Sequence, residues 1–126
     1  MIKMVLAVAL GASGGAILRW LISLGFNSAY QTVPLGTLIA NLLGGYLMGL
    51  ALAFFSHQAA VGAEWRLFVI TGFLGSLTTF SAFSAEVTVL IQQSRMFWAA
   101  GAISAHVIGS LLMTMLGLAT YAWIKG

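Results

Sequence analysis

Residues 72–86 read Gly-Phe-Leu-Gly-Ser-Leu-Thr-Thr-Phe-Ser-Ala-Phe-Ser-Ala-Glu, inside a segment that is otherwise apolar enough to cross a membrane. Glycines, clustered hydroxyls, two phenylalanines and an acid are not what a plain lipid anchor needs. In hydrocarbon an unpaired backbone group is costly, so a helix breaks at mid-membrane only where protein or an ion pathway satisfies the freed groups. Transport proteins place ion sites at such breaks. The stretch therefore indicates ion transport, with a helix break near residues 75–79.

The two phenylalanines of this stretch, Phe80 and Phe83, project from nearly the same side of a helix because they are three residues apart. A phenyl ring has a negative face and a positive edge, so edges turned inward would contact a small anion while excluding water. A phenylalanine pair is more often core packing. The neighbouring hydroxyls of Ser81 and Ser84 favour a pathway instead.

Two further polar residues lie inside predicted spans. Asn41 carries the one amide of the second apolar segment, and a carboxamide offers two donors to an anion without a charge that would trap it. Its alternative role is an interhelical hydrogen bond. Arg19 lies in the far half of the first segment, where it is either a functional intramembrane cation or a side chain that reaches the interface. In both cases it would attract anions to a nearby pathway.

The last apolar segment carries a polar stripe, because His106, Ser110 and Thr114 recur every four residues. The stripe either lines a pathway or bonds to its own helix backbone, and the sequence leaves both readings open. Glu86 closes the unusual stretch and is a further candidate. It would pair with a cation, border a water-filled vestibule or carry protons.

Composition shows which solvent the chain folds in. Of its 126 residues, 61% are hydrophobic and 6% charged, more apolar surface than a soluble domain of this size can bury. A spanning helix needs about 20 apolar residues, and the long uncharged runs accommodate four. The sequence predicts an all-α membrane protein with one domain over residues 1–126. We expect spans at 3–24, 36–56, 65–92 and 97–124, with short connections at 25–35, 57–64 and 92–96.

Other classes of protein fit poorly. The net charge of +3 forms no basic patch, which argues against a nucleic-acid partner. Cysteine is absent, so the chain has no disulfide, thiolate metal site or thiol nucleophile. One intramembrane acid without a second carboxylate, a Ser–His–Asp spacing or a cluster of metal ligands makes an enzyme improbable.

The positive charges are nearly balanced across the membrane. Lys3, Arg66 and Lys125 fall on one side, and Arg19 and Arg95 towards the other. Orientation normally follows such counts, so three against two permits insertion both ways. An antiparallel homodimer then becomes possible, with a two-fold axis in the membrane plane. Alternatively, Arg19 lies too deep to count and both termini are cytoplasmic.

Three motifs, one in each of the first three predicted spans, resemble those of the Fluc (CrcB) fluoride channels, which are small bacterial proteins that act as dual-topology dimers. The similarity covers essentially the whole chain. The motifs are Gly15-Ala16-Ile-Leu-Arg19, similar to G-A-x-x-R, Gly36-Thr37-Leu-Ile-Ala-Asn41-Leu-Leu-Gly44, similar to G-T-L-x-x-N-x-x-G, and residues 72–86, similar to G-F-x-G-G-x-T-T-F-S-T-F-S-x-E.

This resemblance implies two antiparallel subunits that enclose two fluoride pores. Phe80 and Phe83 would present ring edges to the ions, and Asn41 would supply a donor. Arg19 would help to draw anions into a vestibule. A polar track along each pore would comprise Ser81, Ser84 and Thr114.

The resemblance also implies a structural Na⁺ ion at the helix break, on the two-fold axis. Its ligands would be the backbone carbonyls of Gly75 and Thr78 from both subunits, consistent with the preference of hard cations for oxygen. Two positions depart from the family pattern. Ala82 replaces a threonine, which removes one hydroxyl from the track, and Ser76 replaces the second glycine of a pair.

The leading hypothesis is therefore passive, fluoride-selective conduction in the bacterial inner membrane, which would export cytoplasmic fluoride and confer resistance to it. The alternative is a small four-helix multidrug exporter, which exchanges protons for organic cations. Such exporters need an acid, normally in the first helix, where this chain carries Arg19; Glu86 would have to substitute. A third hypothesis, a subunit that only assembles, leaves residues 72–86 unexplained.

Overall fold

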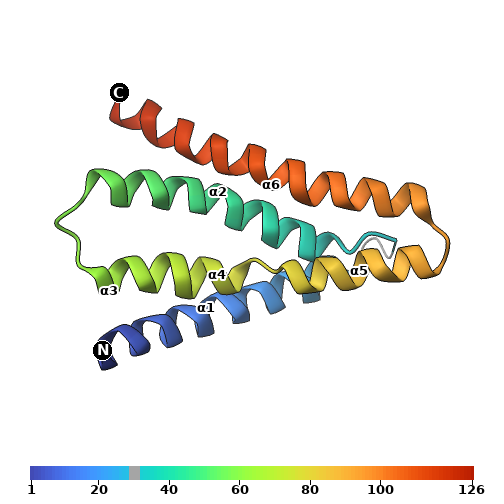
Figure 1. Ribbon diagram of the computed structural model, residues 1–126, viewed down its shortest axis with the longest axis horizontal. Helices are drawn as coiled ribbons and strands as arrows, with labels where there is room; N and C mark the ends of the chain where they lie inside the picture. Colours follow the sequence, from blue (N-terminus) through green and yellow to red (C-terminus); the bar gives the residue numbers. More distant parts are fainter. Residues whose placement is uncertain (29–31) are drawn as a thin grey trace.

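The computed structural model describes residues 1–28 and 32–126, and in that part of the chain it contains helices and turns but no strand. The helices form four antiparallel rods, so the two termini lie at the same end (Figure 1). The third rod is divided into four consecutive elements. In chain order the elements are α1 (Ile2–Phe26), α2 (Leu35–His57), α3 (Ala63–Arg66), η1 (Leu67–Leu74), α4 (Gly75–Leu77), α5 (Phe80–Gln92) and α6 (Met96–Lys125).

The prediction of an all-helical chain with four spans is confirmed, since four helices in the described residues are long and apolar enough to cross a membrane. Their ends lie within a residue or two of the expected ranges. The connection expected over 25–35 includes residues 29–31, which lie outside the described part of the chain.

Close backbone contacts join α1 to the first half of the third rod. Gly11, Gly15 and Gly72 are buried at this contact. A Cβ atom added to Gly11 would collide with the carbonyl of Phe68, and one added to Gly72 would lie 2.7 Å from the carbonyl of Val8. In lipid, small residues at an interface allow helices to approach in this way.

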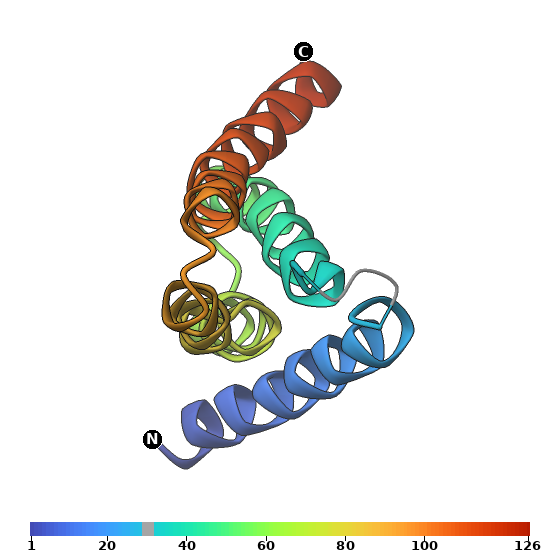
Figure 2. The same cartoon turned by 90° about the vertical axis from the view of Figure 1, so that its right-hand side faces the viewer.

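The second close pair is α2 with α6, where Gly49 and Gly117 face each other's backbone. A Cβ on Gly49 would meet the carbonyl of Thr114, whereas Gly101, nearer the start of α6, has open space around it. Seen along the long axis, α1 and α6 lie on opposite sides, and α2 and the third rod lie between them (Figure 2). The chain is thus an open arrangement rather than a closed four-helix bundle.

The third rod is interrupted where the sequence predicts. Its first half contains the π-helical turns of η1, and α4 ends at Leu77. Thr78 (φ −88°, ψ 155°) and Thr79 (φ −150°, ψ 119°) are extended. The hydroxyl of Thr79 then accepts a hydrogen bond of 3.1 Å from the backbone N–H of Ala82, which caps the start of α5.

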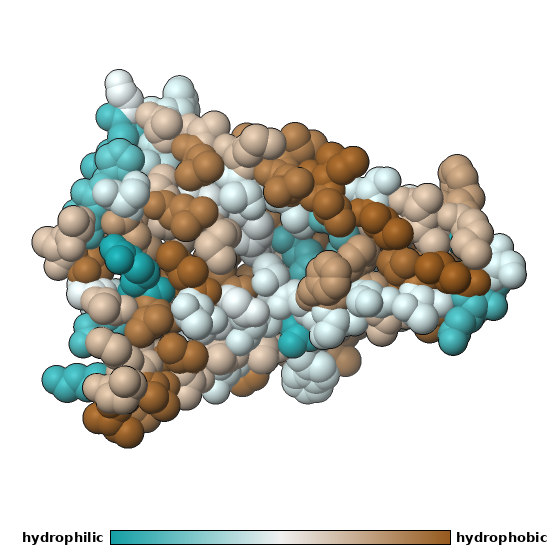
Figure 3. All heavy atoms as spheres, viewed as in Figure 1, coloured by the Kyte–Doolittle hydropathy of each residue, from teal (hydrophilic) through white to brown (hydrophobic). Residues whose placement is uncertain are grey.

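The outer surface suits a bilayer. Hydrophilic side chains gather at the left-hand end of the long axis and at the lower right tip, and hydrophobic or neutral ones cover most of the surface between them (Figure 3). The exposed faces of α1 and α6 carry many large apolar side chains, such as Leu10, Ile17, Leu21, Leu111, Leu112 and Met115.

Candidate functional site

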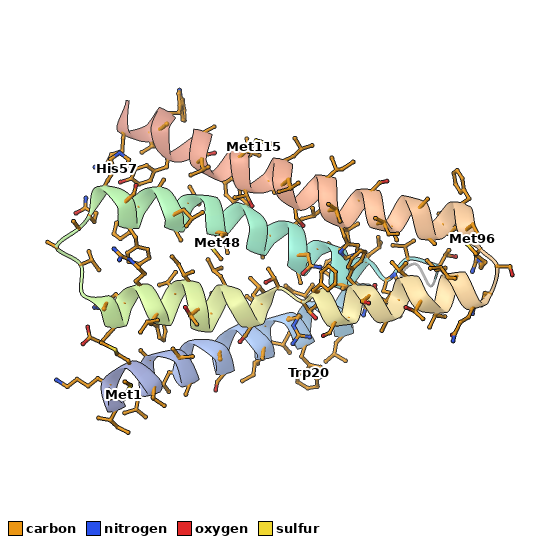
Figure 4. The ribbon with its side chains drawn as sticks, in the orientation of Figure 1. Met1, Trp20, Met48, His57, Met96 and Met115 are labelled. Atoms are coloured by element: carbon orange, nitrogen blue, oxygen red, sulfur yellow. The ribbon has the colours of Figure 1, made fainter. Side chains whose placement is uncertain are left out.

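A cavity of about 330 Å³ lies between α2, the break and α6. Met48, which Figure 4 labels between α2 and the third rod, forms part of its wall. The structure thus brings residues from three rods to one place. The predicted residues that line it are Asn41, Phe80, Phe83, His106, Ser110 and Thr114.

Asn41 bridges α2 to the break. The backbone N–H of Thr79 donates to Asn41 Oδ1 over 2.8 Å, and Asn41 Nδ2 donates to the carbonyl of Thr79 over 3.1 Å. A backbone N–H can only donate, so this pair fixes the orientation of the amide. Asn41 therefore satisfies both backbone groups of a residue that has left the helix, which meets the demand that hydrocarbon places on a break.

The second proton of the same amide points to His106. Asn41 Nδ2 lies 3.0 Å from His106 Nδ1. Because the amide nitrogen is the donor, Nδ1 must accept, and the proton of a neutral imidazole is then on Nε2. His106 is buried, and its Nε2 has no hydrogen-bond partner among the described residues.

The two phenylalanines have different environments. Their ring centroids lie 5.5 Å apart with an interplanar angle of 73°, an edge-on arrangement. Phe83 is 6% exposed and packs against the ring of His106 at 4.5 Å between centroids, whereas Phe80 is 76% exposed. Phe83 therefore belongs to the interior of the chain, and Phe80 borders the cavity from its open side.

The polar stripe on α6 was expected either to line a pathway or to bond to backbone, and its members differ in this respect. The hydroxyl of Thr114 lies 3.0 Å from the carbonyls of both Gly45 and Ser110, so it bonds to backbone. The hydroxyl of Ser110 makes no hydrogen bond to the described residues although it borders the cavity. Ser110 is therefore a free hydroxyl in this space.

Ser81 and Ser84 lie on the exposed face of α5 and do not line this cavity. The hydroxyl of Ser81 is 3.3 Å from that of Thr79. The structure thus separates these two residues from the third member of the expected polar track, Thr114, which faces α2.

Glu86 lines a second cavity, of about 410 Å³, at the end of the molecule where α5 turns into α6. Its Oε2 accepts a 2.6 Å hydrogen bond from the hydroxyl of Thr37, which is buried at the start of α2. Arg95 also borders this cavity. Glu86 therefore lies outside the first cavity, nearer the end of the chain's long axis.

Arg19 borders neither cavity. Its Nε donates over 3.0 Å to the carbonyl of Ser76, in the last turn of the helix that precedes the break. The C-terminal end of a helix carries partial negative charge and unsatisfied carbonyls, so the cation stabilises this end. The expected role of Arg19, to draw anions into a vestibule, stays a prediction.

A family model described as "CrcB-like protein, Camphor Resistance (CrcB)" matches residues 6–118 of the chain. The chain belongs to the CrcB family. Among the curated relatives, the Fluoride-specific ion channel FluC of Tolumonas auensis is 62% identical over 125 residues, which are 99% of this chain and 98% of the relative. The protein of the same name from Pseudomonas aeruginosa is 56% identical over 124 residues, 98% of each chain. That from Pseudomonas putida is 57% identical over 126 residues, 100% of this chain and 99% of the relative.

In this member of the CrcB family, the sequence did not reveal the hydrogen-bond partners of Glu86 and Asn41. Thr37 is part of one of the three motifs, but the resemblance gave it no role. In the structure its hydroxyl donates a hydrogen bond to Glu86. Thr79 was one hydroxyl among several, and its backbone proves to be what Asn41 binds. No signal in a single sequence pairs residues that are 38 or 49 positions apart.

Proposed function

We propose that the chain forms a passive channel selective for fluoride, as the names of its full-length relatives suggest. The observation that carries the proposal is the cavity at the helix break. Its wall combines phenyl rings, the free hydroxyl of Ser110 and the ring of His106, and no carboxylate. These groups favour a small anion and offer no fixed charge to hold it.

The physical difficulty for such a channel is the removal of water from a small, strongly hydrated anion. The O–H of Ser110 supplies a donor, and the positive edges of Phe80 and Phe83 supply weaker contacts. Asn41 holds the break and the histidine in place. An ion that bound directly to Asn41 would have to replace one of the two bonds that its amide already donates.

The direction of transport follows from acid–base chemistry and voltage. Hydrogen fluoride crosses membranes as a neutral acid and ionises in a near-neutral cytoplasm, where the anion is trapped. The chain is a multi-pass protein of the bacterial inner membrane, where an inside-negative potential drives each anion outward by about 2.3 kcal/mol per 100 mV. Conduction thus lowers cytoplasmic fluoride and confers resistance without any enzymatic step.

An antiparallel homodimer completes the proposal. In the single chain, Phe80, Ser81 and Ser84 are exposed within a segment that is long and apolar enough to span a membrane. A second copy in the opposite orientation would cover this polar face. The balanced positive charges and the even number of spans support insertion in both orientations.

A Na⁺ ion between the two copies fits the break. Helix ends leave carbonyls without N–H partners, and transporters use such ends to bind Na⁺. Thr78 has left the helix, and Gly75 is exposed without a side chain to cover its backbone. Their carbonyls would hold the ion, which would supply a fixed positive charge between the subunits.

Proteoliposomes loaded with potassium fluoride provide the test. On addition of valinomycin, we expect rapid release of fluoride at a fluoride electrode and no comparable release of chloride from matched vesicles. Ser110→Ala should slow fluoride release several-fold because a cavity donor is lost. Ser104→Ala, an exposed serine of the same helix that borders neither cavity, should not.

Equal release of fluoride and chloride, or none of either, would refute the channel. The same assay with a large organic cation in place of Na⁺ tests the ion at the break, and we expect slower release and loss of the dimer. An intact, fully active dimer after exhaustive removal of Na⁺ would contradict the cation site and leave the fluoride channel standing.

A further inference from the structure

The second cavity contains two opposite charges that do not pair. Glu86 and Arg95 both border its space of about 410 Å³, together with Thr32 and Gln93. The carboxylate of Glu86 bonds to Thr37, and Arg95 forms no ion pair with any residue of the described ranges. No carboxylate of the described residues therefore neutralises the charge of this guanidinium.

The backbone of Arg95 is positioned by the turn between α5 and α6. Ser94 adopts φ 58°, the left-handed conformation that ends many helices. The N–H of Ser94 then donates to the carbonyl of Ile91 over 2.9 Å, and that of Arg95 to the carbonyl of Leu90 over 2.8 Å. This pair of bonds sets the direction in which the chain leaves α5.

The side chain of Arg95 is held as well. Its Nη2 donates to the hydroxyl of Thr32 over 3.2 Å, which joins the turn to the segment before α2. Figure 4 shows Met96, the next residue, at the end of the molecule remote from the chain termini. Arg95 is exposed to solvent and yet tethered at the rim of the cavity that Glu86 lines.

We propose that Arg95 is an anion-recruiting residue at the mouth of the pathway, which concentrates small hydrated anions such as fluoride beside the Glu86 cavity. The inference rests on the proposed channel function. A carboxylate in a mouth repels anions, and a cation at the rim of the same cavity offsets that repulsion. A positive charge at the rim attracts anions over several ångströms and so raises their rate of entry past the carboxylate.

A charge at the rim acts mainly on the rate of entry and on its salt dependence. Its action also depends on ionic strength, because the Debye length falls from about 30 Å at 0.01 M salt to about 3 Å at 1 M. The recruiting role therefore has a signature that a purely structural role lacks. Removal of the charge should slow fluoride only when the salt concentration is low.

The experiment compares fluoride release by the wild-type protein and by Arg95→Gln over a range of potassium gluconate concentrations, with gluconate as an anion too large to permeate. At low ionic strength we expect Arg95→Gln to release fluoride several-fold more slowly. Near 1 M salt the two rates should converge. Arg95→Lys, which keeps the charge, should restore most of the rate, and the preference for fluoride over chloride should not change.

Lys3→Gln is the matched control, since it removes one positive charge from an exposed site that borders neither cavity. Equal rates for Arg95→Gln and the wild type at low ionic strength would overturn the inference and leave the channel function intact. A rate lowered to the same degree at every salt concentration would also overturn it, because that result indicates a loss of structure. A wild-type protein that releases no fluoride would overturn both proposals.

Discussion

Phe80 and Phe83 are the same type of residue in different surroundings, and the surroundings determine what each ring does. Both lie in the first turn of α5, and their rings meet edge to face. One packs on His106 inside the chain, and the other points away from the interior and is mostly exposed. The same substitution at the two positions should therefore have different consequences.

Phe83→Ala should destabilise the folded chain by about 3 kcal/mol, because the cavity left between α5 and α6 cannot close fully. Phe80→Ala should cost much less stability, because most of its ring lies outside the interior of the chain, and should still reduce fluoride release. Heating followed by size-exclusion chromatography reports stability, and the fluoride electrode reports conduction. Equal loss of stability in both variants would contradict the different roles assigned to the two rings.

At the scale of elements, α1 packs on η1 and α6 packs on α2. Both contacts depend on close approach of the backbones rather than on interlocking side chains. Lipid tails are as apolar as leucine, so helices associate in a bilayer through close packing and hydrogen bonds. The glycines of α1 and η1 allow this approach, and it brings Arg19 to the carbonyl of Ser76. The geometry of the break thus depends on the position of α1.

Gly11→Ala should push α1 away from η1, because its methyl group would collide with the carbonyl of Phe68. We expect lower thermal stability and slower fluoride release together. Gly101→Ala is the matched control, since nothing lies within 4 Å of a methyl group there. It should be neutral or stabilise α6 by up to about 1 kcal/mol through helix propensity. A Gly11→Ala variant as stable as the control would show that this contact is dispensable.

At the scale of the whole molecule, the proposed homodimer depends on the exposed hydroxyls of α5. Polar groups that face lipid are costly in a membrane. In the proposed antiparallel dimer, a second copy in the opposite orientation would cover these hydroxyls.

Because the chain has no cysteine, single cysteines report its orientation directly. For Ile2→Cys and for Gly126→Cys, a thiol reagent that cannot cross the membrane should label about half of the protein from outside intact cells. The remainder should become accessible only after permeabilisation. Complete labelling from one side, or none, would rule out dual topology and with it the antiparallel dimer.

The sequence alone was sufficient for four spans, because long uncharged runs leave a chain in a bilayer no alternative to helices. It also located the break, because glycines and clustered hydroxyls are out of place in a plain membrane-spanning helix. Only the tertiary structure decided which groups give that support. Asn41 meets Thr79, Glu86 meets Thr37, and Arg95 meets Thr32 across distances of 38, 49 and 63 residues. These pairs depend on how whole helices approach one another, and local periodicity carries no information about that approach.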